Sequence, residues 1–251
     1  MSYFGYQGKK IYYKEYGEGK PVVFLHGNTA SSRMFEPLCQ LYEEGMKIIL
    51  IDFLGHGRSD RLDEFPVDLW QEEARQTIAL LEHLHCGKAG LVGTSGGAWA
   101  AVNAALERPD LMDRVAADSF DGRRLAEGFA ASLMDERKAA KKDAQALWFY
   151  EWCQGTDWER VVDMDTRALV RCAEEESPLF CRPIGELQVP LFLLGSREDN
   201  MIRKDFEKEY EEIAKETGAK IRIFETGGHP AIYSNAEKAA EEIRRFMLED
   251  N

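Results

Sequence analysis

Short apolar runs alternate along this chain with longer segments in which apolar residues recur every three or four positions. The runs at residues 22–25, 48–51 and 89–92 are continuous, which is typical of strands buried on both faces of a parallel sheet. Segments of helical spacing, such as residues 69–84, lie between and after these runs. Repeated strand–helix units predict an α/β fold with a mostly parallel central sheet flanked by helices.

The same two patterns predict the remaining elements. We expect strands at residues 3–6, 10–16, 22–25, 48–51, 89–92, 114–117, 189–194 and 220–224. We expect helices at residues 32–44, 69–84, 206–217 and 236–248, and another directly after Ser95. The first two strands are expected to form a hairpin, and the alternating pattern of the last predicts an outer strand.

Residues 121–185 break this alternation, because they contain no convincing buried strand and carry aromatic and aliphatic residues at helical spacings. We interpret them as a helical cap, or lid, inserted into a core made of residues 1–120 and 186–251. Most of the aromatic side chains are expected to pack inside the insertion. The residues that we expect to line a substrate pocket are Phe129, Leu133, Trp148 and Trp152. The stretch Asp163-Met164-Asp165 is interpreted as the surface of a helix.

Composition narrows the class of protein. The 251 residues carry a formal net charge of −13, which argues against nucleic acid or an anionic membrane as a partner. No apolar run approaches the length of a membrane span, and the first residues do not resemble a signal peptide. The five cysteines are odd in number and form no C-x-x-C pair, so we expect reduced thiols. These features predict a cytoplasmic protein, either a monomer or a small homo-oligomer.

The segment Gly93-Thr94-Ser95-Gly96-Gly97 carries the strongest chemical signal. An apolar run precedes it and an alanine-rich helical segment follows, which is the strand–turn–helix context of a G-x-S-x-G nucleophile elbow. The sharp turn strains Ser95 and brings Gly93 close to Gly97, where side chains would collide. The following helix would direct its N-terminal N–H groups toward whatever Ser95 attacks.

Four motifs follow successive predicted strands: His26-Gly27-Asn28, the segment Asp52-Phe-Leu-Gly-His-Gly-Arg-Ser59, the elbow, and Gly227-Gly228-His229-Pro230. With these motifs the chain resembles the α/β-hydrolase superfamily over essentially its whole length. It looks most like the small bacterial esterase-like members with a helical cap. The resemblance implies an α/β-hydrolase fold and a catalytic triad in the order serine, acid, histidine.

A serine hydroxyl needs a neighbouring base that a third group orients. Of the five histidines, His229 alone lies in a glycine-flanked loop after the last strand, so we predict that it is the base. The acid is expected in the loop after residues 189–194, where Glu198 and Asp199 are adjacent. We favour Asp199, and Asp118, at the end of residues 114–117, is a third possibility.

The tetrahedral intermediate of acyl transfer needs two N–H donors. The residue after the nucleophile, Gly96, supplies one, and the resemblance implies that Asn28 supplies the other. The side-chain amide of Asn28 is a further potential donor, and haloalkane dehalogenases use asparagine at this place to hold halide. Those enzymes need an aspartate nucleophile, so Ser95 disfavours that activity. No zinc-ligand spacing, Walker loop or dinucleotide motif is present, so no metal or cofactor is expected.

The sequence thus predicts a serine hydrolase acting on small carboxylic esters through an acyl-enzyme. A lactonase, a C–C bond hydrolase or an aminopeptidase would use the same triad. A non-catalytic ligand receptor on a hydrolase fold is the alternative from another class, because a fold alone does not establish chemistry.

Overall fold

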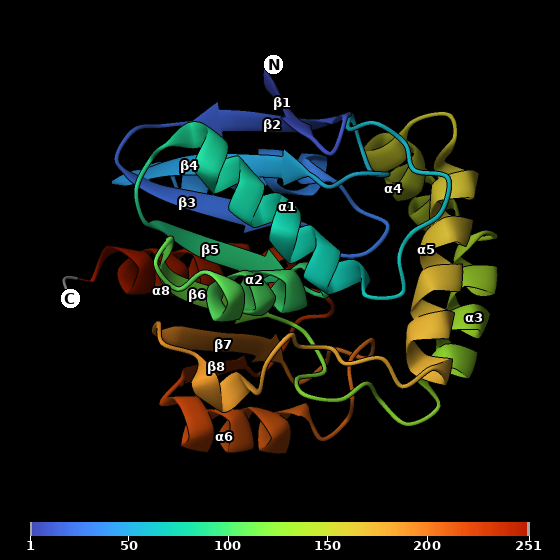
Figure 1. Cartoon of the computed structure of the whole chain (residues 1–251). Helices are drawn as coiled ribbons and strands as arrows, with labels where there is room; N and C mark the ends of the chain where they lie inside the picture. The colour runs from blue at the N-terminus through green and yellow to red at the C-terminus, as the bar shows by residue number, and fades with distance from the viewer. Residues whose placement is uncertain (1, 250–251) are drawn as a thin grey trace.

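A single eight-stranded sheet organises the computed structural model, which describes residues 2–249 (Figure 1). The strands are β1 (Ser2–Tyr6), β2 (Lys9–Tyr16), β3 (Lys20–Leu25), β4 (Met46–Asp52), β5 (Ala89–Thr94), β6 (Met112–Asp118), β7 (Leu191–Ser196) and β8 (Lys220–Phe224). The helices are η1 (Ser32–Leu41), α1 (Leu69–Leu84), α2 (Gly96–Glu107), α3 (Phe129–Ala140), α4 (Ala144–Gln154), α5 (Trp158–Glu174), η2 (Ile184–Glu186), α6 (Phe206–Thr217), α7 (Ala231–Ser234) and α8 (Ala236–Leu248).

The strands lie in the order β1-β2-β4-β3-β5-β6-β7-β8. The β1–β2 and β2–β4 pairs are antiparallel, and every other neighbouring pair is parallel. The predicted α/β-hydrolase fold, a mostly parallel sheet flanked by helices, is therefore confirmed. Because parallel strands end at the same edge, the loops that follow β3, β5, β6, β7 and β8 meet there.

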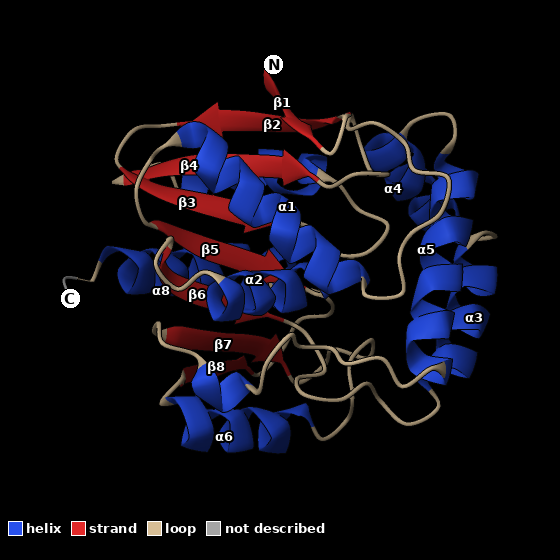
Figure 2. Ribbon diagram, in the orientation of Figure 1, coloured by secondary structure: helices blue, strands red, loops and turns tan. Residues whose placement is uncertain are grey.

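Helices cover both faces of the sheet (Figure 2). Val23 and Leu25 of β3 belong to the core that includes α1, α2 and α6. Val22 and Phe24 of the same strand belong to the core that includes η1 and α8. Successive strand residues point to opposite faces, so a continuous apolar run is what a strand between two helical layers requires.

Several predicted elements differ by a few residues from those observed, and proline accounts for two of the differences. The segment at 32–44, predicted as a helix, is the 3₁₀ helix η1, which ends at Leu41. It contains Pro37, whose ring lacks an N–H and crowds the preceding turn of an α-helix. The strand predicted at 189–194 begins only at Leu191, directly after Pro190, because proline cannot donate to a strand ladder.

The segment between β6 and β7 is helical, and α3, α4 and α5 lie beyond the carboxyl edge of the sheet (Figure 1). We refer to these three helices as the cap; the division into a core of residues 1–120 and 186–251 and a cap of residues 121–185 stays a prediction. The interpretation of Asp163-Met164-Asp165 as helix surface is wrong for two of its members. Met164 is 4% exposed and Asp165 is 0% exposed, because both lie on the face of α5 that packs inward.

No helix within residues 2–249 is both long enough and apolar enough to cross a membrane. All five cysteines are free thiols, three of them buried.

A carboxylate is buried at the carboxyl edge of the sheet. Asp118, the last residue of β6, accepts hydrogen bonds from the hydroxyls of Thr94 and Ser119 at 2.7 and 3.0 Å and from the N–H of Ile232 at 3.2 Å. Burial raises the pKa of Asp118 to about 6, although these donors act in the opposite direction. Ionising Asp118 therefore costs more free energy in the folded chain than in the unfolded chain.

We expect the variant Asp118→Asn to gain stability relative to the wild type as the pH rises. Because the folded pKa lies above the unfolded one, the contribution of Asp118 is complete below about pH 4 and is lost as the pH rises through about 6. The neutral amide does not suffer this loss, so the stability difference should shift by roughly 1 kcal/mol between about pH 5 and 8. Urea unfolding of both proteins measures it. A difference that is constant, or that favours the wild type at the higher pH, contradicts the expectation.

Candidate active site

Ser95 occupies a strained turn between β5 and α2. Its φ is +54° and its ψ is −124°, a conformation that non-glycine residues rarely adopt. A Cβ on Gly93 would lie 2.1 Å from the carbonyl oxygen of Gly97, and a Cβ on Gly97 would lie 2.2 Å from that of Leu25. Only glycine fits at these two positions, so the turn needs both glycines of the sequence motif.

The neighbouring strands hold Ser95 at the edge of the sheet. Its N–H donates a 2.8 Å hydrogen bond to the carbonyl oxygen of Asp118. A Cβ on Gly27 would lie 3.0 Å from Cβ and 3.5 Å from Oγ of Ser95, so the loop after β3 passes directly beside the hydroxyl. Ser95 lines two cavities, and His229 lines both of them as well.

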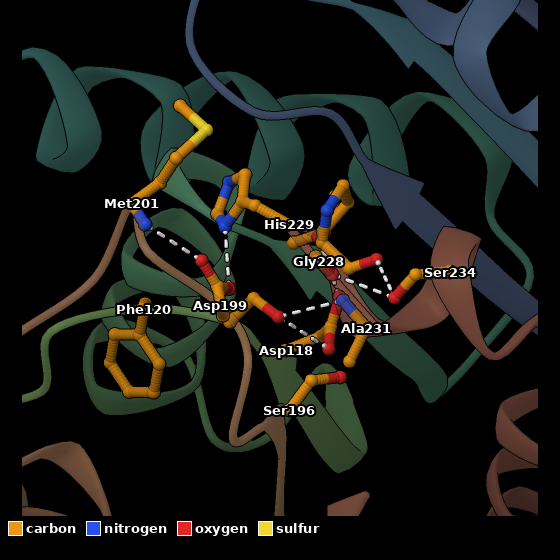
Figure 3. A network of polar contacts seen from close by, with 12 residues as sticks. Asp118, Phe120, Ser196, Asp199, Met201, Gly228, His229, Ala231 and Ser234 are labelled. Atoms are coloured by element: carbon orange, nitrogen blue, oxygen red, sulfur yellow. Dashed lines mark hydrogen bonds and ion pairs between the residues drawn. The ribbon is translucent and has the colours of Figure 1, made fainter. Parts of the chain in front are cut away.

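His229 and Asp199 are in direct contact (Figure 3). Oδ2 of Asp199 lies 2.8 Å from Nδ1 of His229, and Oδ1 accepts a 2.9 Å hydrogen bond from the N–H of Met201. The side chain of Asp199 is 0% exposed and that of His229 is 12% exposed. A carboxylate on Nδ1 places the proton on that nitrogen and leaves Nε2 as the basic atom.

The other two carboxylates considered as the acid have different partners. Glu198 is exposed, and its Oε2 accepts a 3.0 Å hydrogen bond from the N–H of Gly227 in the histidine loop. The carboxylate of Asp118 accepts its hydrogen bonds from Thr94, Ser119 and Ile232.

The side chain of Asn28 is engaged on both of its polar atoms. Its Nδ2 donates a 2.7 Å hydrogen bond to Oδ2 of Asp165 on α5, and its Oδ1 accepts a 3.1 Å hydrogen bond from Nε1 of Trp70 on α1. A Cβ on Gly96 would lie 2.1 Å from Oδ1 of Asn28, so the amide packs directly on Gly96. The side-chain amide is therefore committed to Asp165, which leaves the backbone N–H of Asn28 as the donor to consider.

The two cavities differ in size and lining. The larger, of about 550 Å³, is lined by Trp148 and Trp152, and the smaller, of about 60 Å³, by Phe129 and Leu133. The structure thus brings all four predicted pocket residues to the cavity walls. The residues that line both cavities are Asn28, Ser95, Glu136, Arg137, Met201 and His229.

Sequence reasoning missed several polar residues of the cap. Arg137 lines both cavities, Gln154 contacts the loop after β3, and Asp165 contacts Asn28. The sequence did contain a signal for the burial of Asp165. This residue lies four positions from both Val161 and Leu169, which form the buried stripe of α5.

His26 and His56 are fully buried next to the site, with ring centroids 5.1 Å apart. Nδ1 of His26 lies 2.9 Å from the carbonyl oxygen of Gly27, and its Nε2 accepts a 3.1 Å hydrogen bond from the N–H of Phe53. Burial lowers the pKa of both rings, for His56 well below its ordinary value. Both rings are therefore neutral and fill the space next to the loop after β3.

No group of three or more histidine, cysteine, aspartate or glutamate side chains in the described part of the chain is arranged to hold a metal ion.

Comparison with known proteins places this site in a family. The sequence profile of the alpha/beta hydrolase family matches residues 22–242. The AB hydrolase superfamily protein YisY of Bacillus subtilis is 24% identical to this chain, with 94% of each chain covered. YugF, an uncharacterized hydrolase of the same organism, is 32% identical over 114 residues, which span 45% of this chain and only 41% of YugF.

Two solved structures share the fold. The esterase EaEST from Exiguobacterium antarcticum superposes with a TM-score of 0.76 at 20% identity, covering 96% of this chain and 97% of that one. The E-2-(acetamidomethylene)succinate hydrolase gives the same TM-score and identity, with 97% of each chain covered. A likeness at this identity describes the fold alone. The family profile, which spans most of the sequence, carries the assignment: this chain belongs to the alpha/beta hydrolase family.

Proposed function

We propose that this protein is a serine hydrolase that cleaves small carboxylic esters through an acyl-enzyme intermediate. Ser95 is the nucleophile, His229 the general base, and Asp199 the acid that orients His229. The observation that carries the proposal is the 2.8 Å contact between Asp199 and His229 at cavities that also contain Ser95 in its strained turn.

The first half of the reaction acylates the enzyme. Nε2 of His229 takes the proton from Oγ of Ser95 while Oγ attacks the ester carbonyl carbon, and the buried carboxylate of Asp199 stabilises the imidazolium that forms. The backbone N–H groups of Asn28 and Gly96 stabilise the oxyanion. The imidazolium then gives its proton to the departing alkoxide, and the carbon–oxygen bond breaks.

Water completes the cycle. His229 removes a proton from a water molecule, the hydroxide adds to the acyl carbon, and the second tetrahedral intermediate expels Ser95 with the proton returned to Oγ. The carboxylic acid leaves and the resting site is restored.

The two cavities support a substrate with one short arm and one long arm. The smaller cavity, of about 60 Å³, has far less room than the larger one of about 550 Å³, so it suits the shorter arm. We assign the acyl group to the smaller cavity and the alcohol to the larger one. The mouth of the larger cavity includes Trp148, which is 61% exposed, and Tyr233, which is 43% exposed, so an apolar or aryl alcohol fits it best.

We expect Ser95→Ala to abolish labelling by a fluorophosphonate probe and to lower kcat by several orders of magnitude. Loss of the nucleophile in a protease of the same chemistry costs roughly 10⁶ in kcat. Gel fluorescence of the labelled protein and hydrolysis of p-nitrophenyl acetate measure the two effects, and circular dichroism checks the fold. Unchanged turnover by a pure, folded variant would sink the assignment. If the wild-type protein reacts with the probe but hydrolyses no ester, a different substrate class is favoured instead.

Three single variants identify the acid. We expect Asp199→Asn to lower kcat by about 10⁴, because an amide at this position favours the wrong tautomer of the base. Glu198→Gln and Asp118→Asn should each cost far less, since neither carboxylate contacts the ring of His229 through a hydrogen bond. The three are assayed side by side with p-nitrophenyl acetate. If a folded Glu198→Gln or Asp118→Asn loses more activity than Asp199→Asn, that residue is the acid instead.

Enlarging the smaller cavity should change acyl-chain preference. Leu133 is 6% exposed and lines this cavity, so Leu133→Ala should shift kcat/KM toward longer acyl chains by about 10-fold or more per accommodated methylene. The p-nitrophenyl esters from acetate to octanoate measure the shift. The matched control is Met134→Ala, because the neighbouring Met134 is 49% exposed and lines neither cavity. Equal chain-length profiles for Leu133→Ala and the wild type contradict the acyl assignment.

A lactonase, a C–C bond hydrolase or an aminopeptidase would use the same three residues. The ester panel, extended by a lactone and an aminoacyl anilide, ranks these activities by kcat/KM. A non-catalytic receptor would take up the fluorophosphonate probe no faster than Ser95→Ala.

A further inference from the structure

Side chains of the cap hold the loop that carries Asn28. Asp165 of α5 accepts a 2.7 Å hydrogen bond from Nδ2 of Asn28. Gln154, the last residue of α4, donates from Nε2 to the carbonyl oxygens of Thr29 and Ala30 at 3.0 and 2.7 Å. Two cap helices therefore reach one segment of the core, residues 28–30.

This segment has a strained backbone. Thr29 has a φ of +58°, which is a genuine outlier for a β-branched residue. Such a conformation persists only where the surroundings determine it. The core supplies one support, a 3.2 Å hydrogen bond from the N–H of Ala30 to the carbonyl oxygen of Gly27 that closes a turn around Thr29. The cap supplies two more: Gln154 is bonded to the carbonyl oxygen of Thr29, and Asp165 contacts the backbone of Thr29 as well as the side chain of Asn28. The shape of the loop thus depends in part on groups that belong to the cap.

Of the contacts that Asp165 makes, the one with the Asn28 side chain leads to the reacting centre. On its other end, Asn28 accepts the hydrogen bond from Trp70 and packs on Gly96. The amide is held between α5 on one side and α1 and α2 on the other. A shift of this amide would carry the backbone N–H of Asn28 with it, and oxyanion stabilisation depends on donor distances within a few tenths of an ångström.

Packing alone gives a poor account of a carboxylate at position 165. Its nearest cation is Arg137, whose Nη2 lies 3.5 Å from Oδ1, longer than a strong charge-assisted hydrogen bond. Burial raises the pKa of Asp165, against the influence of Arg137 and Asn28, so its charge is costly to keep. An apolar side chain on the stripe of Val161 and Leu169 would fill the same place without that cost.

We propose that Asp165 is a positioning residue for the oxyanion hole. It lines neither cavity and contacts no reacting atom, but through Asn28 it sets the place of the backbone donor beside Ser95. The oxyanion hole is then complete only when α5 is docked on the core. This inference rests on the proposed function, since it assigns the Asn28 N–H a role in ester hydrolysis.

The test compares Asp165→Asn with Asp163→Asn in the full-length protein. Asp163 lies on the same helix and forms a 2.6 Å ion pair with Lys141, but its side chain is 46% exposed and does not reach the core. With p-nitrophenyl acetate, we expect Asp165→Asn to lower kcat by up to about 100-fold with little change in KM, because a misplaced donor weakens only the transition state. Asp163→Asn should match the wild type. A folded Asp165→Asn with wild-type kcat, or with a raised KM alone, overturns the proposal.

A double-mutant cycle tests the route through Asn28. Asn28→Ala keeps the backbone N–H and removes the side chain that Asp165 holds. If Asp165 acts through this side chain, Asp165→Asn should lower kcat by less than about threefold in the Asn28→Ala background. Fully additive losses mean that Asp165 acts elsewhere, as a general structural residue would, and overturn the proposal. If Asp165→Asn does not fold, Asn28→Ala cuts the same contact from the core side, and wild-type kcat in that variant has the same consequence.

The variant Ser95→Ala, assayed in parallel, separates this inference from the proposed function. If Ser95→Ala retains the ester hydrolysis of the wild type, the proposed function itself is wrong. If Ser95→Ala is inactive while Asp165→Asn is fully active, only the role of Asp165 is wrong.

Discussion

The backbone of Ser95, with a φ of +54°, is a conformation that only close packing can maintain, and the rest of the site is arranged around it. Gly93 lies against the carbonyl group of Gly97, Gly97 against that of Leu25, and Gly27 against Ser95 itself. A side chain at Gly93 or Gly97 would separate β3, β5 and the start of α2. Because these three elements converge, the hydroxyl, the first turn of a helix and the loop after β3 lie side by side.

The parallel pairing of β7 with β8 explains why Asp199 and His229 lie together. β7 and β8 are neighbours at the edge of the sheet, so the loops that follow them carry Asp199 and His229 to the same side. The loop after β7 also contains Glu198, which contacts the histidine loop at Gly227 rather than the ring. One loop therefore makes two contacts to the next, one with the imidazole and one with the backbone that carries it.

The cap supplies part of the cavity walls. Its helices contribute Leu133, Arg137, Trp148 and Trp152 to the cavity walls, while the core contributes Ser95 and His229. An esterase and a hydrolase of a succinate derivative share this fold at 20% identity, so the fold does not select the substrate. The buried polar contacts of Gln154 and Asp165 hold the cap against the core.

The sequence by itself determined the order of strands and helices, because burial between two layers imposes a period of 2 or 3.6 on apolar residues. It also marked the elbow at Ser95, because close backbone approach excludes every side chain at two positions. It predicted Asp199 and His229 as site residues from the loops that carry them, but it could not give the distance between their side chains. The partner of the Asn28 amide, the burial of Asp165 and the two cavities were decided only by the tertiary structure. Asn28 and Asp165 lie 137 residues apart, and no local pattern records which polar groups meet when a distant helix docks.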